Sequence, residues 1–184
     1  MSTQINILSA NPYTITGGLY TQTSSSTPVT NTIVETSLLD GGLGSLTVPA
    51  NGFKVGDSFN AILTGHISSV NNHTLHIKIK TGSVILADTG LITMPSTTTK
   101  HWKLEAAFTV RAIGASGVAK IAAGGLFIYT KDASNAFEGT NFSTETTTGF
   151  DTTISNTLAI TAQWGTANAG DSIYSEIFTL YKTY

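Results

Sequence analysis

Hydrophobic and polar residues alternate along much of this chain, with a period of two. The alternation is clearest in four stretches, "FNAILTGHI" (59–67), "LHIKIK" (75–80), "WKLEAAFTVRA" (102–112) and "LAITAQW" (158–164). Successive side chains of an extended strand point to opposite faces, so such a run places its apolar residues on one face. The pattern therefore predicts β-strands that belong to antiparallel sheets with one packed face and one polar face.

Turn-forming residues separate these runs at short intervals. They include "LDGGLG" (39–44), "VPANGFKVGDS" (48–58), "AAGG" (122–125) and "NAGD" (168–171). No segment of ten or more residues has apolar positions with helical spacing. We therefore predict an all-β fold of about eight to ten strands, arranged as a two-sheet sandwich or a closed barrel.

The last predicted strand, "SIYSEIFTLYKT" (172–183), differs from the others because large apolar residues fall on both of its faces. Strict alternation puts Ile173 and Ile177 on one side and Tyr174, Phe178 and Leu180 on the other. This pattern predicts a strand that is covered on both sides.

The first 32 residues have a different character. They suggest an arm followed by a short strand, and "TQTSSSTPVTN" (21–31) lacks periodicity and is rich in Ser, Thr and Pro, as linkers are. We assign residues 1–32 to an N-terminal arm and linker, and residues 33–184 to one folded domain.

Composition narrows the classes of function. Only 11% of the 184 residues are charged, the net charge is −2, and no basic stripe is present, so we expect no nucleic-acid partner. No apolar run is long enough to span a membrane, and the first residues do not resemble a secretory signal. The chain has no Cys and therefore neither disulfides nor thiolate chemistry.

Candidate catalytic groups are sparse. The acidic residues are scattered, mostly among turn residues, and no nucleophile elbow or phosphate loop is present. His66 and His76 are the histidine pair that can meet on neighbouring strands, but two exposed histidines on a polar sheet face explain the pattern better than a zinc site. We expect no enzymatic activity, no metal and no cofactor. Tyr20 and Phe142 lie near turn-rich segments, where they can contact sugars or a neighbouring subunit, or else close one end of the sandwich.

Three stretches, taken in order, carry a resemblance to a known family. They are "LTVPANGFKVGDSFNAILTGHIS", "WKLEAAFTVRAIGASG" and "FDTTISNTLAITAQWGTANAGDSIYSEIFTLYK". Together they resemble the jelly-roll domain, similar to the tumour-necrosis-factor/C1q type, of head-decoration and fibre-tip proteins from bacteriophages and large DNA viruses. The resemblance covers residues 43–184, and its specificity comes from the ordered set of stretches.

The resemblance implies a homotrimer in which the C-terminal strand lies near the three-fold axis. Tyr174, Phe178 and Leu180 would then form the trimer interface. The N-terminal arm would attach the domain to a major capsid or fibre protein, on the surface of a virion assembled from protein made in the host cytoplasm.

The alternatives are a fibre-tip knob that binds a receptor or host-surface glycan, an enzyme acting on glycans, and a secreted cytokine-like ligand. The missing carboxylate pair argues against the enzyme, and the missing signal argues against the secreted ligand.

Overall fold

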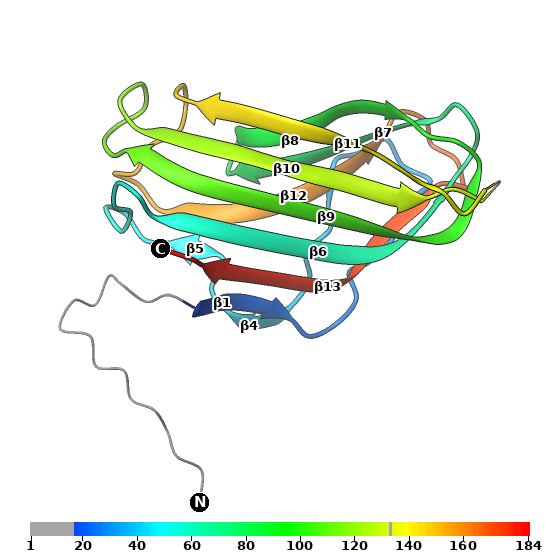
Figure 1. Cartoon of the computed structure of the whole chain (residues 1–184), viewed down its shortest axis with the longest axis horizontal. Coiled ribbons are helices and arrows are strands. Elements are labelled where there is room, and N and C mark those ends of the chain that lie inside the picture. The colour runs from blue at the N-terminus through cyan, green and yellow to red at the C-terminus, as the bar shows by residue number, and fades with distance from the viewer. Residues whose placement is uncertain (1–16, 133) are drawn as a thin grey trace, which may run out of the picture.

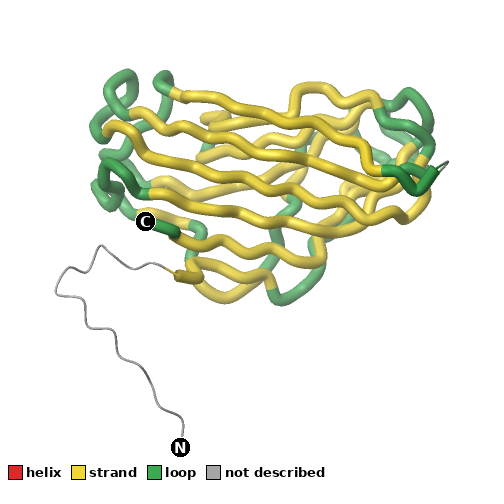
Figure 2. Tube along the Cα trace, viewed as in Figure 1, coloured by secondary structure: helices red, strands yellow, loops and turns green. Residues whose placement is uncertain are grey.

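The computed structural model describes residues 17–132 and 134–184, which form two antiparallel β-sheets packed face to face (Figure 1). These residues contain thirteen strands. Figure 2 shows strands and loops along this part of the chain and no helix. The expected all-β, sandwich-like architecture is confirmed. The strands outnumber the predicted eight to ten because several of them are only two or three residues long.

The large sheet has eight strands. Its order across the sheet is β11 (Phe137–Thr146), β10 (Lys120–Thr130), β9 (Thr97–Ala112), β6 (Ser58–Ser69), β13 (Ser172–Lys182), β1 (Gly17–Gln22) and β4 (Gly42–Gly44). The short strand β2 (Val29–Thr30) pairs with β13 beside this path. Figure 1 shows this sheet in front, with β11 at the top and β4 at the bottom.

The small sheet lies behind the large one and has five strands. Its order is β3 (Thr36–Ser37), β12 (Asn156–Trp164), β7 (Thr74–Thr81) and β8 (Val84–Thr93), and β5 (Thr47–Val48) pairs with β12. The core fills the space between the two sheets. The alternation read from the sequence is confirmed here, because Leu63, Ile77, Trp102 and Ile160 all face inward and are fully buried. Each such side chain contributes about 1.5–3 kcal/mol through burial.

The segment assigned to an arm and linker contributes to the large sheet from residue 17 onward. Strand β1 pairs with β13, and β2 pairs with the beginning of the same strand. Between them the amide of Ser26 donates to the carbonyl of Ser175 at 2.8 Å. Backbone hydrogen bonds of this kind form without an alternation of hydrophobic and polar residues. The sequence of residues 17–32 therefore did not indicate that this segment pairs with β13. Residues 1–16 of the predicted arm lie outside the described residues.

A β-bulge interrupts strand β13 between Ser175 and Ile177. The extra residue shifts the alternation by one, so the faces of the strand exchange sides at this point. Ile173 and Ser175 face the core before the bulge, and Phe178 and Leu180 face it afterwards, with exposed fractions of 0% and 6% for the last two. The placement of Phe178 and Leu180 on the outward face with Tyr174 is therefore wrong.

Several buried groups hold this bulge in place. The indole nitrogen of Trp102 donates to the carbonyls of His66 at 3.0 Å and Tyr174 at 3.2 Å. The hydroxyl of Ser175 donates to the carbonyl of Leu38 at 2.5 Å and accepts from the Gln22 amide at 3.0 Å. Because buried polar groups are costly when unpaired, these bonds favour the bulged conformation over a regular strand.

Candidate functional site

The outward face of the small sheet carries a cluster of charged side chains. Lys78 and Lys80 project from β7, and their ammonium groups lie 2.7 and 2.6 Å from the two carboxylate oxygens of Glu35. Thr161 on β12 donates its hydroxyl to the same carboxylate at 3.0 Å. The hydrogen bonds from Lys78 and Lys80 lower the pKa of Glu35 from 4.5 to about 2. This cluster ties the segment before β3 to the middle of the sheet.

Replacing Glu35 with Gln should lower the free energy of unfolding by about 1–2 kcal/mol at pH 7, after allowance for solvent screening. A carboxylate whose pKa is lowered on folding stabilises the protein above its unfolded pKa, and that stability is lost as the pH falls through the folded pKa. The difference between wild type and Glu35→Gln should therefore shrink between pH 5 and pH 2. Urea unfolding at several pH values measures it, and a difference of equal size at pH 7 and pH 2 would contradict the assignment.

The outward face of the large sheet carries both charged pairs and apolar side chains. It carries a set of large apolar and aromatic side chains on β6, β10 and β13, which we call the outer apolar face: Ile62, Leu126, Ile128, Tyr174, Ile177 and Tyr181. Ile177 is 57% exposed and Leu126 is 40% exposed. In the middle of this face the charged side chains of Lys103 and Glu105 pair with each other. Such an apolar area on a sheet face is typical of an interaction surface.

A hollow of about 330 Å³ lies within this face, beside β9 and β10. Its floor is formed by residues with little or no side chain, including Ala107 and Gly124, and Leu126 and Tyr181 stand at its walls. A β-carbon at Gly124 would meet no atom closer than 3.5 Å, which shows how open the surface is there. The face therefore combines projecting side chains with a cavity that can receive one.

The structure places the five residues singled out in the sequence in different surroundings. Tyr174 lies on the outer apolar face, with its ring 5.8 Å from that of His66, whereas Phe178 and Leu180 face the core. Tyr20 lies in β1, where its ring packs 5.7 Å from Phe178 and its hydroxyl donates to the carbonyl of Asp40 at 2.5 Å. Phe142 lies in β11 and packs against the core. The expectation that Tyr20 and Phe142 lie in contact loops is therefore wrong.

Two further residues of the large sheet are exposed. Ile177 was assigned to the inner side of its strand, and the bulge brings it outward. Phe137, at the start of β11, is 77% exposed and flanks a shallow depression with Leu126 and Ile128. The exposure of Ile177 has no sequence signal of its own, because it depends on strand register.

The histidines do not form a metal site. His66 and His76 lie in different sheets, and each has a carboxylate neighbour, Glu176 at 3.2 Å and Asp88 at 3.5 Å. His73 lies 2.6 Å from the buried carboxylate of Asp171, which also accepts from the amide of Val70. Within residues 17–132 and 134–184, no three His, Asp or Glu side chains come together as metal ligands would.

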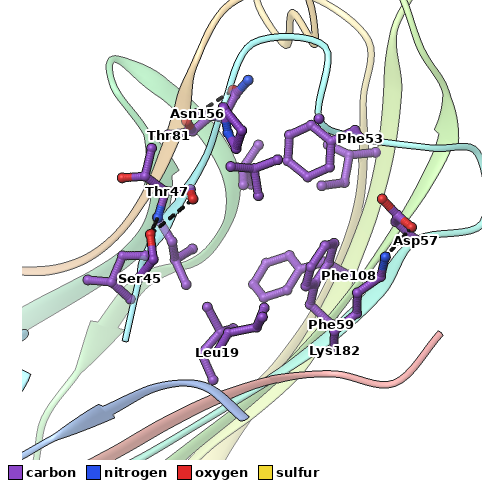
Figure 3. A pocket seen from close by; sticks show the side chains of 18 of the residues that line it. Leu19, Ser45, Thr47, Phe53, Asp57, Phe59, Thr81, Phe108, Asn156 and Lys182 are labelled. Atoms are coloured by element: carbon purple, nitrogen blue, oxygen red, sulfur yellow. Dashed lines mark hydrogen bonds and ion pairs between the residues drawn. The ribbon is translucent and has the colours of Figure 1, made fainter. Parts of the chain in front are cut away.

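A pocket opens between the two sheets, beside the C-terminal end of β13 (Figure 3). Its volume is about 280 Å³, and we call it the end pocket. Apolar side chains from both sheets and from the 45–57 segment line it; they include Leu19, Leu46, Phe53, Phe59, Phe108, Phe150 and Leu158. The wall also carries the Asp57–Lys182 ion pair on one side and the Thr81–Asn156 hydrogen bond on the other, as Figure 3 shows.

No helix long and apolar enough to cross a membrane occurs in the part of the chain that the structure describes. No protein-family model matches this chain, and no curated protein was found to be similar to it.

Proposed function

We propose that this chain is a non-enzymatic structural protein that assembles into a homotrimer through the outer apolar face of its large sheet. The observation that carries the proposal is the contrast between the two outward sheet faces. One carries the charged cluster of Lys78, Lys80 and Glu35 beside the exposed Leu91. On the other, Leu126 and Ile177 are exposed within the set of six large apolar and aromatic side chains that forms the outer apolar face. Exposed apolar side chains concentrated on one face are stabilised when a second copy covers them.

The order of the strands supports the jelly-roll part of this proposal. Eight strands taken in chain order correspond to the strands of a jelly roll, namely β1, β3, β6, β7, β8, β9, β12 and β13. The first, eighth, third and sixth are neighbours in the large sheet, and the second, seventh, fourth and fifth are neighbours in the small sheet. This is the order that two interlocked Greek keys give. Strands β10 and β11 then form a hairpin added after the sixth strand.

The position of β13 supports the trimer part. Strand β13 lies between β6 and β1, inside the large sheet. Tyr174 faces outward before the bulge, and the bulge turns Ile177 to the same side. In the family that the sequence resembles, the C-terminal strand lies near the three-fold axis. Here Tyr174 and Ile177 take the interface role that the sequence assigned to Tyr174, Phe178 and Leu180.

By the same resemblance we propose that the trimer decorates a capsid or caps a head fibre on the virion surface, and that the N-terminal segment attaches it there. The surface outside the outer apolar face suits this setting, because only 11% of the chain is charged and polar uncharged residues are abundant. The glycan-binding alternative relied on Tyr20 and Phe142 in loops. Since both residues lie in strands and are partly buried against the core, assembly is the function better supported.

Particles purified by density gradient from the source of this sequence should contain the chain in a fixed ratio to the main shell protein, with a copy number divisible by three. Quantitative mass spectrometry of the particles measures the ratio. A chain that is absent from the particles, or present in variable amounts, would contradict the proposed structural role.

A further inference from the structure

The end pocket is distinct from the outer apolar face, because it opens between the sheets rather than on their outside. We infer that it binds a small uncharged apolar molecule, such as one aromatic ring or a short acyl chain. The inference does not depend on the proposed assembly, because none of the six residues that define the outer apolar face lines this pocket.

The polar groups in the wall are already bonded to other parts of the protein. The Asp57 carboxylate accepts from the amide of Lys54 at 2.8 Å and pairs with the Lys182 ammonium at 2.6 Å. The hydroxyl of Thr81 donates to the Asn156 side chain at 3.1 Å, and the amide of Asn156 donates to two backbone carbonyls. A charged or strongly polar ligand needs hydrogen bonds from the pocket wall. These groups could provide them only by giving up the bonds that they already make within the protein. The wall therefore favours an occupant without polar groups.

Size and shape support the same class of ligand. An apolar cavity of about 150 Å³ in another protein stays free of water and takes up benzene. The end pocket has about 280 Å³ and carries the rings of Phe53, Phe59 and Phe108 on its wall (Figure 3). A bound water needs two to four polar partners, and these walls offer mainly hydrocarbon. A single ring or a short alkyl chain fills such a volume. Binding then removes the apolar surfaces of both the ligand and the pocket wall from water, which is favourable.

Toluene is the probe that tests this inference on the full chain. In nuclear magnetic resonance titrations, toluene should bind with a dissociation constant of about 1 mM or tighter, which is ordinary for a ligand of this size. Intermolecular contacts should appear between its protons and those of Phe53 and Phe150, two rings that line the pocket. These contacts locate the ligand without any variant.

Leu158→Trp should fill the pocket and weaken toluene binding at least tenfold, because Leu158 lines it from β12. Leu46→Phe, on the neighbouring 45–57 segment, is the second filling variant in case the first does not fold. The matched control is Leu91→Trp, on the exposed outside of β8, which should bind toluene as wild type does. The inference is overturned if folded wild type shows no contacts to Phe53 and Phe150, or if a folded filling variant binds toluene equally well.

Discussion

Gly65→Val should destabilise the folded chain by more than about 3 kcal/mol, among the largest effects that a single substitution can have in this protein. Gly65 lies on β6 opposite Ser175, where the bulged strand β13 comes close. A β-carbon at Gly65 would lie 2.0 Å from the carbonyl oxygen of Tyr174 and 2.8 Å from the α-carbon of Ser175. Both neighbours are backbone atoms, so the strands must separate to admit any side chain.

Urea denaturation followed by tryptophan fluorescence measures this loss, since Trp102 is buried and bonded to the two carbonyls at the bulge. Gly18→Val is the matched control, because Gly18 also lies in the large sheet and a β-carbon there meets nothing within 4 Å. If Gly65→Val unfolds at the same urea concentration as Gly18→Val, the close approach of β6 and β13 described here is wrong.

Ile177→Asp should dissociate the proposed trimer while leaving the sandwich folded. Ile177 is 57% exposed on the outer apolar face, so an aspartate there is solvated in the single chain. In an assembly that covers this face the same carboxylate is buried without a partner, which costs several kcal/mol and weakens association by roughly a hundredfold or more. Light scattering gives the mass, and circular dichroism shows whether the sheets persist.

Leu91→Asp is the matched control for Ile177→Asp. Leu91 is 72% exposed and lies opposite His76, on the outward face of the small sheet. The Leu91→Asp variant introduces the same charge on the face that is not proposed to assemble. It should leave the mass of the assembly unchanged. An Ile177→Asp protein that keeps the wild-type mass, or a Leu91→Asp protein that loses it, would place the interface elsewhere. Phe178→Asp is unsuitable for this test because Phe178 is fully buried and its replacement would unfold the chain.

The sequence predicted the sandwich well wherever one strand face is buried without interruption. Leu75, Ile77 and Ile79 alternate with polar residues and lie in the core as expected, because a strand of period two needs no information from its neighbours. The stretch "AAGG" at 122–125 was misinterpreted as a turn because of Gly124 and Gly125. They lie inside β10, where Gly125 leaves room for the ring of Phe142 and Gly124 opens the hollow on the outer apolar face.

The candidate site could be predicted only in part, because the bulge in β13 depends on groups distant in the sequence. Gly65 and Trp102 accommodate and bond it from β6 and β9, and Gln22 bonds Ser175 from β1. No sequence feature between Ser175 and Ile177 indicates an extra residue. A prediction from strict alternation therefore assigned Ile177 and Phe178 to the wrong faces of the strand. The same dependence on strand pairing hid the inward packing of Tyr20 and Phe142.

The mass of the full-length protein in solution tests the central claim most directly. Light scattering at about 10 µM protein should give three times the chain mass of 19.2 kDa, as expected if copies cover one another's outer apolar face. A mass of one chain at this concentration and at tenfold higher concentration would show that the face remains exposed, and would contradict the proposed assembly.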